Sequence, residues 1–326
     1  MIGVIGQGFV GGSLTTVFTE RGEKVVVFDK AGKVATGGMN TFERLNDDGV
    51  TEAFQPSSIF EFVQSCELSR GFSGVFFVCV PTPMKQDGSA DTSIVHSVLE
   101  DIAAVPDNWE SPNRIAVVKS TIPPGTTEGW NQDFESRGFS LRVVFNPEFL
   151  TEANAVQDMR NQNRIILGGP RPYINTVKQI FQKAFPQVPI VKTSSTTAEM
   201  VKYATNCFLA VKVSFANELS QICEVLDEKG LNIDYDKVVE YAKLDKRLGD
   251  SHWSVPGPVP THDGRFVRGF GGHCFPKDLN ALSSIARENG VKPTVMEAAW
   301  EKNLEVRGPD DRDWEKMKGR AVSDES

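Results

Sequence analysis

The sequence VIGQGFVGG, residues Val4–Gly12, predicts the fold of the N-terminal half of this 326-residue chain. Gly6, Gly8 and Gly11 form a GxGxxG pattern that follows the apolar run Ile2–Ile5 and precedes a helical pattern. In such a unit the first glycine permits a tight turn, the second lets a pyrophosphate approach the backbone, and the third packs helix on strand. The N–H groups of the helix N-terminus then face the phosphates. The segment predicts a dinucleotide-binding turn, and a glycine-rich turn without a cofactor is the alternative.

The sequence after this turn alternates short apolar runs with helical patterns. The expected strands are Ile2–Ile5, Lys24–Phe28, Val75–Val80, Ile115–Lys119, Leu141–Phe145, Arg164–Leu167 and Val188–Val191, and the expected helices among them include Val10–Arg21, Thr92–Ala104, Thr126–Arg137 and Tyr173–Phe185. Strands that alternate with helices indicate a parallel sheet covered on both faces. Residues 1–192 are therefore predicted to form a Rossmann-like, doubly wound α/β domain.

The choice of dinucleotide follows from the end of the second expected strand. Asp29 stands there, 18 residues beyond Gly11. A carboxylate at this position hydrogen-bonds a ribose diol and repels a 2′-phosphate, which favours NAD over NADP. Lys30 and Lys33 lie close by in the sequence and leave NADP as the alternative.

A helical region follows. No proline or glycine interrupts residues 196–229, Thr196 and Glu199 have the spacing of a capping box, and Gly230 is placed to end the helix. A helix of this length would measure about 50 Å. That length predicts packing against a second copy in a homodimer, and a helix inside one bundle is the alternative.

The rest of the chain completes an all-helical central domain over residues 193–308. Further helices are expected at Asp234–Leu244, Lys277–Asn289 and Pro293–Val306, with a Pro- and Gly-rich loop at 246–268. Residues 309–326 form a charged C-terminal tail that contains Trp314, either as a docked short helix or as a frayed end.

Composition restricts the function classes. The net charge of −8 disfavours binding to nucleic acid or to a membrane surface. The cysteines are scattered without CxxC spacing, which predicts no disulfide, no zinc or other metal site, and a reducing compartment. The N-terminus runs directly into an expected strand without a signal sequence, and no apolar run reaches the roughly 20 residues of a membrane span. A cytoplasmic location is expected.

Two short motifs follow expected strands. VPTP is Val80–Pro83, and STIPPGT is Ser120–Thr126. Because ligands bind outside the carboxyl ends of strands in such sheets, Thr82, Ser120 and Thr121 are expected to face the cofactor. Ordinary turn and capping chemistry is the alternative.

Two further motifs carry charged or polar side chains. NPEFLTE, Asn146–Glu152, would bring Glu148 and Glu152 to the same edge of the sheet. Lys202 and Asn206 stand four residues apart, hence on one face of the long helix. Considered alone, the helix residues also fit a solvated surface.

The last motif is GFGGHCFPKD, Gly269–Asp278. Its glycines let the backbone pass close to a bulky ligand. Cys274 stands at the expected start of a helix and near Lys277, which favours the thiolate. Considered alone, a small buried cysteine is the alternative.

Taken together and in this order, the motifs resemble the UDP-glucose/GDP-mannose dehydrogenase family over nearly the whole chain. The resemblance implies a four-electron oxidation of a sugar C6 hydroxyl to a carboxylate with two NAD⁺, through a thiohemiacetal and a thioester on a cysteine. The catalytic residues that it implies are Cys274, Lys202, Asn206, Asp278, Thr121 and Glu148.

The resemblance also implies the role of each residue. Cys274 is the nucleophile, and Lys202 and Asn206 stabilise the oxyanions. Asp278 orients or activates the lysine–water system, and Thr121 and Glu148 position the water. The implied NAD contacts are Gly6, Gly8, Phe9, Val10, Gly11, Asp29, Lys30, Pro81, Thr82, Ser120, Thr121, Glu152 and Lys277. The implied substrate contacts are Glu148, Phe149, Leu150, Glu152, Lys202, Asn206, Phe270, Gly271 and Cys274, with Arg265 and Arg268 as expected phosphate contacts.

The sequence departs from the family pattern in two places. Full-length members carry a third, C-terminal α/β domain over the nucleotide, whereas this chain stops soon after the central helices. We therefore expect a short form whose uridine end is held by the loop at 246–268 and the dimer partner, or by another chain. His273 is typical of members that oxidise UDP-N-acetylhexosamines, but the FPKD that follows favours UDP-glucose.

Several alternatives to this function remain. The sugar nucleotide could be GDP-mannose or a UDP-N-acetylhexosamine. A β-hydroxyacid dehydrogenase also combines a Rossmann domain with a helical Lys and Asn pair, but it has no use for Cys274. A non-catalytic nucleotide-sugar-binding homologue is the alternative from a different class.

Overall fold

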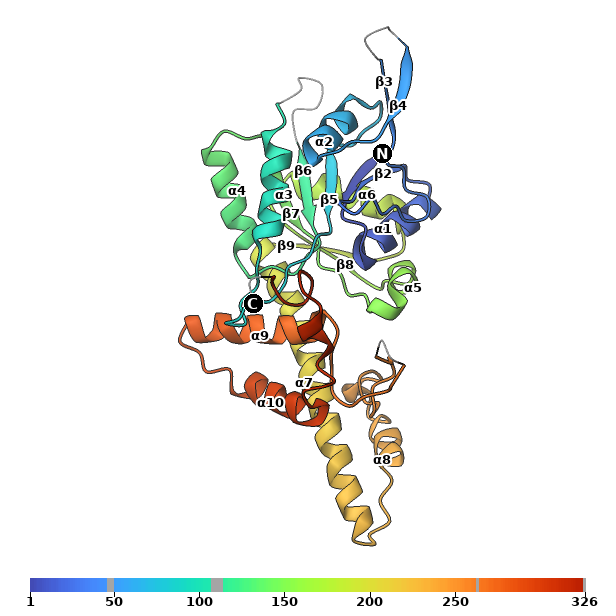
Figure 1. Cartoon of the computed structure of the whole chain (residues 1–326), viewed down its shortest axis with the longest axis vertical. Coiled ribbons are helices and arrows are strands. Elements are labelled where there is room, and N and C mark those ends of the chain that lie inside the picture. The colour runs from blue at the N-terminus through green and yellow to red at the C-terminus, as the bar shows by residue number, and fades with distance from the viewer. Residues whose placement is uncertain (46–49, 107–113, 262–263, 325–326) are drawn as a thin grey trace. The chain divides into compact units, whose positions relative to one another are not determined.

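The computed structural model describes residues 1–45, 50–106, 114–261 and 264–324 (Figure 1). Residues 262–263 of the expected loop and 325–326 of the expected tail lie outside the described residues. The chain splits into two compact units, one formed by Met1–Thr82 with Thr92–Lys202 and the other by Pro83–Asp91 with Tyr203–Ser326. The boundary falls inside the long helix.

The first unit is built on a twisted sheet. Its strands are β1 (Ile2–Ile5), β2 (Val25–Phe28), β5 (Val75–Val78), β6 (Ile115–Val118), β7 (Arg142–Phe145), β8 (Ile165–Gly168) and β9 (Ile190–Thr193). Among the described residues they form a seven-stranded sheet in the order β2-β1-β5-β6-β7-β8-β9. Most of their side chains are apolar and buried, as expected for strands covered on both faces.

One strand pair departs from the expected parallel arrangement. β7 and β8 are antiparallel, with Phe145 opposite Gly168. The segment between them holds only η1 (Glu152–Asn154) and α5 (Ala155–Arg160), and a helix of six residues is about 9 Å long. The segment contains no long helix to carry the chain back along the sheet, and α5 packs on α1 instead. The chain therefore enters β8 from the edge where β7 ends.

Helices cover the two faces of this sheet (Figure 1). They are α1 (Phe9–Glu20), α2 (Ile59–Leu68), α3 (Ser93–Ala104), α4 (Thr126–Ser136) and α6 (Tyr173–Ala184). Side chains of α2, α3 and α4 share one buried cluster with Phe76, while α1, α5 and α6 share the other with the next residue, Phe77. This alternation confirms the predicted doubly wound α/β fold. A short antiparallel pair, β3 (Phe42–Leu45) and β4 (Thr51–Phe54), and helix α2 were not predicted.

The second unit is mainly helical. It contains most of α7 (Ser195–Glu228), then α8 (Tyr235–Ala242), η2 (Lys246–Leu248), α9 (Cys274–Glu288), α10 (Thr294–Arg307) and η3 (Asp313–Lys316). Its core joins Tyr203, Cys207 and Ala210 of α7 to Phe270 and Leu279. In the described part of the chain, no helix is both long and apolar enough to cross a membrane.

Helix α9 begins three residues before the expected start at Lys277, because Pro276 fits within its first turn. Proline is tolerated there, since the N–H that it lacks would have no partner inside the helix. This earlier start makes Cys274 the first residue of α9.

The predicted capping box of the long helix is wrong. Ser194 caps α7, and its Oγ accepts a hydrogen bond from the N–H of Thr197. The carboxylate of Glu199 instead accepts hydrogen bonds from the N–H groups of Gly125 and Thr127 at the start of α4, at 2.6 and 2.9 Å. A helix N-terminus offers unpaired donors to any nearby carboxylate, and here the acceptor lies more than 70 residues away in sequence.

The segment after α10 is docked as far as Ser323. Trp314 of η3 is 2% exposed. Met84 donates its N–H to the carbonyl of Ala321 and accepts one at its own carbonyl from Ser323, both at 2.9 Å. The loop at 83–91 and the C-terminal segment therefore pair within the second unit.

Candidate active site

The glycine turn between β1 and α1 has the shape that a dinucleotide needs. Gly6 has φ of +89°, and a Cβ there would lie 2.6 Å from the carbonyl oxygen of Cys79. A Cβ on Gly11 would lie 1.9 Å from the carbonyl oxygen of Gly6. Both positions therefore require glycine. A Cβ on Gly8 would meet no atom within 4 Å, so this glycine leaves space for a ligand at the start of α1.

Asp29 is fixed beside this turn at the end of β2. Its Oδ2 accepts a hydrogen bond from the N–H of Gln7 at 2.8 Å, and its Oδ1 accepts from the N–H of Ala31 at 2.9 Å. A pocket next to it is lined by Val27, Phe28, Asp29, Gly32, Lys33, Asn40, Gln55 and Pro56. A second, open pocket over the start of α1 is lined in part by Gly8, Phe9 and the expected cofactor residue Glu152. The second pocket lies where a pyrophosphate would approach the start of α1.

The loops after β5, β6 and β7 are tied together at one edge of the sheet. Ser120 donates its Oγ to the carbonyl of Val80 at 2.5 Å. Lys119 donates its Nζ to Oδ1 of Asn146 at 2.7 Å. Thr82 and Thr121 are buried in these loops. The three motifs that the sequence placed at strand ends thus form one polar edge.

Lys202 and Glu148 form a buried ion pair at this edge. The Nζ of Lys202 lies 2.7 Å from both Oε1 and the main-chain carbonyl oxygen of Glu148. The Oε2 of Glu148 accepts a hydrogen bond from the N–H of Leu150, and the ring of Phe149 lies 5.8 Å from the lysine nitrogen. The pair holds an ammonium group in a fixed position, as stabilisation of a developing oxyanion requires.

Lys119 is a further buried lysine at this edge that sequence reasoning missed. Burial, above all, lowers its pKa to about 8, against the raising effect of Cys79 and Glu148. Burial likewise raises the pKa of Cys79 to about 12, so that thiol stays protonated at neutral pH. A lysine as the last residue of the apolar run IAVVK was the available signal.

A second polar group lies in the helical unit around Asp278, which is 0% exposed. Asn206 donates its Nδ2 to Oδ2 of Asp278 at 2.6 Å, and Lys277 lies 2.5 Å from Oδ1. Lys277, an expected cofactor residue, therefore forms an ion pair with Asp278. Lys202 and Asn206 are one turn apart on α7, as predicted.

Cys274 differs from the other cysteines of the described residues. Cys66, Cys207 and Cys223 are buried, and burial raises the pKa of the Cys207 thiol. Cys79 and Cys274 have intermediate exposure as whole residues, but desolvation of the Cys79 thiol raises its pKa, as described above. Cys274 combines exposure with the first position of a helix, where N–H groups favour a thiolate.

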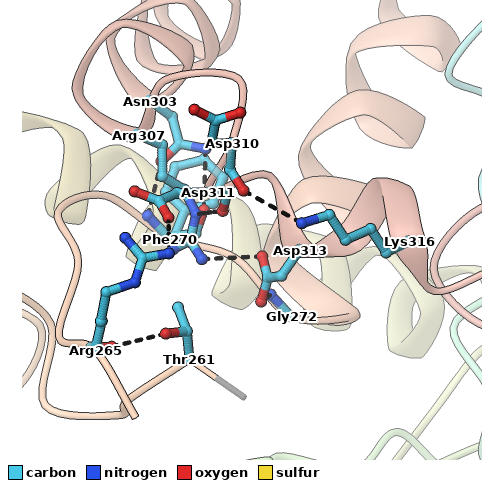
Figure 2. Close-up of polar contacts among 10 residues, drawn as sticks. All are labelled: Thr261, Arg265, Phe270, Gly272, Asn303, Arg307, Asp310, Asp311, Asp313 and Lys316. Atoms are coloured by element: carbon cyan, nitrogen blue, oxygen red, sulfur yellow. Dashed lines mark hydrogen bonds and ion pairs between the residues drawn. The ribbon is translucent and has the colours of Figure 1, made fainter. Parts of the chain in front are cut away.

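The expected phosphate contacts are engaged by acidic residues. Arg265 pairs with Asp311 at 2.7 Å (Figure 2), and Arg268 pairs with Glu224. Among the expected substrate contacts, Phe270 is buried, and its ring contacts those of Phe275 and Trp300.

Comparisons with known proteins agree with these features. Residues 1–185 match the NAD binding domain of the UDP-glucose/GDP-mannose dehydrogenase family, and residues 196–305 match its central domain. A putative UDP-glucose 6-dehydrogenase of Bacillus subtilis is 32% identical over 305 residues, which cover 90% of this chain and 65% of the relative. The chain thus spans about two thirds of the length of such relatives.

Solved structures extend the likeness to the fold. A UDP-glucose dehydrogenase from Pyrobaculum islandicum superposes with a TM-score of 0.70 at 28% identity, covering 93% of this chain and 68% of that one. A UDP-D-ManNAc dehydrogenase from Pyrococcus horikoshii gives 0.66 at 25% identity, covering 94% and 68%. The two matched domains, which together span most of the chain, show that it belongs to the UDP-glucose/GDP-mannose dehydrogenase family.

Proposed function

We propose that this chain is an NAD-dependent nucleotide-sugar 6-dehydrogenase that oxidises the C6 hydroxyl of UDP-glucose to the carboxylate of UDP-glucuronate. The observation that carries the proposal is the position of Cys274, partly exposed at the start of α9, in a chain with an NAD-binding domain. Oxidation of an alcohol to an aldehyde needs no thiol. A thiol is needed to hold the aldehyde as a covalent adduct that can lose a second hydride.

The first oxidation depends on Lys202. Bound NAD⁺ accepts one hydride in each of the two oxidations. As the C6 hydroxyl passes its proton to a water molecule, the ammonium group of Lys202, fixed by Glu148, stabilises the alkoxide. Asn206, one turn along α7, supplies an amide donor for the same oxygen.

The second half of the reaction takes place on Cys274. The thiolate adds to the aldehyde carbon and gives a thiohemiacetal, whose oxygen Lys202 and Asn206 stabilise. Loss of the second hydride gives a thioester. Asp278 activates a water that attacks the carbonyl, and Thr121 and Glu148 help to position it; this step releases the carboxylate and the free thiol. The sum is one alcohol, two NAD⁺ and one water, converted to one carboxylate, two NADH and three protons.

The choice of UDP-glucose is supported by the names of the relatives and by FPKD after Cys274. GDP-mannose and UDP-N-acetylhexosamines remain the alternatives, since a relative of known structure acts on UDP-D-ManNAc. We propose that the pyrophosphate of the sugar nucleotide binds near Arg265 and Arg268 in the loop at 246–268. The uridine end is assigned to this loop together with a second copy or another chain.

We propose a homodimer through α7. Phe208, Phe215 and Ile222 recur at seven-residue intervals and are each about half exposed or more, with Val225 beside them. This spacing places them along one stripe of the helix, and a stripe of exposed large apolar residues is typical of an interface. The free thiols support a reducing, cytoplasmic location.

We keep the domain division proposed from the sequence, in which residues 1–192 bind NAD and residues 193–308 carry Cys274 and the dimer face. Residues 309–326 were expected as a separate charged tail, but their described part belongs to the second compact unit.

NADH formation with a panel of sugar nucleotides tests the function. Purified protein is mixed with excess NAD⁺ and a limiting amount of UDP-glucose, GDP-mannose or UDP-N-acetylmannosamine, and absorbance gives the NADH formed per sugar. Two NADH per UDP-glucose are expected. One NADH would indicate a simple alcohol dehydrogenase, and none with any sugar, despite binding by calorimetry, would indicate a binding protein. The matched control is Cys274→Ser, which should lose steady-state turnover.

A further inference from the structure

Side chains from two helices hold the backbone of the loop that leads into Cys274. The N–H of Gly269 donates to Oδ1 of Asn217 on α7 at 3.2 Å. Asn303 on α10 is fully buried; its Oδ1 accepts from the N–H of Phe270 at 2.7 Å, and its Nδ2 donates to the carbonyl of the same residue at 3.0 Å (Figure 2). The first half of the loop is therefore fixed by paired amides.

The second half of the loop is held by the segment that follows α10. Oδ2 of Asp313 accepts a hydrogen bond from the N–H of Gly272 at 3.1 Å (Figure 2). Its Oδ1 accepts from Nη2 of Arg307 at 2.9 Å. Arg307 is 7% exposed and donates its Nε to the carbonyl of Asp311 at 2.7 Å. One carboxylate thus connects a buried guanidinium to the backbone two residues before Cys274.

Gly271 shows how closely this ion pair fits the loop. A Cβ at this position would lie 2.2 Å from Oδ1 of Asp313 and 2.5 Å from Nη2 of Arg307. Real Cβ atoms do not approach other atoms so closely, so the pair lies flush against the glycine backbone. Within the second unit, Gly271 is explained by this contact without any ligand.

Aromatic packing fixes the segment that carries Asp313. The ring of Trp314 lies 5.5 Å from that of Trp300 on α10, and Trp300 lies 6.2 Å from Phe270 in the loop. Beyond Trp314, the pairing of Ala321 and Ser323 with Met84 fixes the segment again. Asp313 therefore lies between the end of α10 at Arg307 and the anchored Trp314, and is itself in a fixed place.

We propose that Asp313, held by Arg307, is a positioning residue for Cys274. A loop with three glycines in four residues has many accessible conformations, and ordering it costs conformational entropy. By fixing Gly272, Asp313 sets the direction of the Cys274 thiol and its distance from the N–H groups at the start of α9. A nucleophile displaced by about 1 Å can lose on the order of a hundredfold in rate. The proposal builds on the proposed function, in which Cys274 is the nucleophile.

Alkylation of Cys274 by iodoacetamide tests this positioning without any turnover. The variants are Asp313→Ala and Asp313→Asn, and the control is Asp310→Ala, which removes an exposed acid from the same segment. The rate at Cys274 is measured by peptide mass spectrometry across a range of pH. We expect Asp313→Ala to move the rate profile to higher pH, because the thiol leaves the helix N-terminus. Asp310→Ala should match the unaltered protein.

Steady-state kinetics gives the second readout. We expect Asp313→Ala to lower kcat by about ten- to a hundredfold and to change KM for the sugar nucleotide much less, because positioning acts on the reacting thiol. The amide oxygen of Asp313→Asn can accept a hydrogen bond from Gly272 or from Arg307, but its amide nitrogen cannot accept the other. Its kcat should therefore lie between those of the unaltered protein and Asp313→Ala. This variant also tests the proposal if Asp313→Ala folds poorly.

The proposal is overturned if both Asp313 variants keep the alkylation profile and kcat of the unaltered protein, or if Asp310→Ala shows the same losses. If the alkylation profile shifts while no sugar nucleotide yields NADH, the positioning stands and the proposed function fails.

Discussion

The Nζ of Lys202 lies 2.7 Å from Oε1 of Glu148, and the two side chains are only 3% and 6% exposed. A buried pair of this kind gives little net stability, but removal of one partner leaves an uncompensated charge. We expect Glu148→Ala to lower the free energy of unfolding by about 3–5 kcal/mol in urea titrations. Adding Lys202→Met should restore most of the loss.

The exposed pair of Arg287 and Glu297 is the matched control, because solvent screens it. Glu297→Ala should change the free energy of unfolding by about 1 kcal/mol or less. Equal losses in Glu148→Ala and Glu297→Ala would contradict a buried ion pair at Lys202.

Lys119 predicts a pH dependence of stability. Burial lowers its pKa from 10.5 to about 8, so the charged form is disfavoured in the folded protein. Below pH 8 the lysine is protonated in both states and the folded protein bears the full cost. Between the two pKa values the unfolded chain binds more protons, so this cost is relieved as pH rises.

The variant Lys119→Met lacks this cost at every pH. Its free energy of unfolding, relative to the unaltered protein, should therefore be most favourable below pH 8 and decline as pH rises toward 10. Urea titrations of both proteins at several pH values measure the difference. The loss of the hydrogen bond to Asn146 adds a constant offset. A difference that does not change with pH would show that Lys119 has an ordinary pKa.

Gly8 and Gly11 should respond differently to alanine. Because space surrounds Gly8, Gly8→Ala should fold with an unchanged melting temperature but bind NAD on the order of tenfold or more weakly, since the new Cβ occupies the approach of the pyrophosphate. Gly11→Ala should be destabilised outright, since its Cβ would meet the carbonyl of Gly6.

Gly129→Ala in α4, also with open space, is the control for Gly8→Ala and should leave NAD affinity unchanged. Fluorescence titration with NADH and thermal melts provide the two readouts. If Gly8→Ala binds NADH as tightly as the unaltered protein, the pyrophosphate does not bind at this turn.

The proposed dimer face predicts that charged substitutions on α7 lower the molecular mass of the assembly in solution. Phe208→Asp and Ile222→Glu each place a charge on the exposed stripe of α7 and should convert a dimer to a monomer in light scattering after size exclusion. Leu244→Glu changes another exposed apolar residue and should leave the mass unaltered. A monomeric unaltered protein, or a dimer that survives both charges, would contradict the proposed face.

Much of the fold follows from local sequence patterns. The strands of the main sheet and the long helix could be located because each has a characteristic hydrophobic periodicity and is bounded by residues that end helices or strands. The order of motifs also led to Lys202 and Glu148, which the structure pairs. These features depend on neighbours in sequence or on a recognisable family pattern.

Other features depend on partners that are distant in sequence. The carboxylate of Glu199 was assigned to its own helix, but it binds the start of α4 more than 70 residues earlier. Asp313 stood in what looked like a charged tail and instead holds Gly272. A lysine such as Lys119 looks ordinary until its burial is known. Local patterns carry no information on such pairings.

The central claim is that Cys274 carries the substrate as a thioester. The most direct measurement is the mass of the Cys274 peptide after Asp278→Asn protein has been mixed with UDP-glucose and NAD⁺ and quenched in acid. Because hydrolysis should be slowed in this variant, the account predicts a peptide heavier by the UDP-glucuronyl group. An unmodified Cys274 peptide in a sample quenched after two NADH have formed per enzyme, but before any UDP-glucuronate is released, would contradict it.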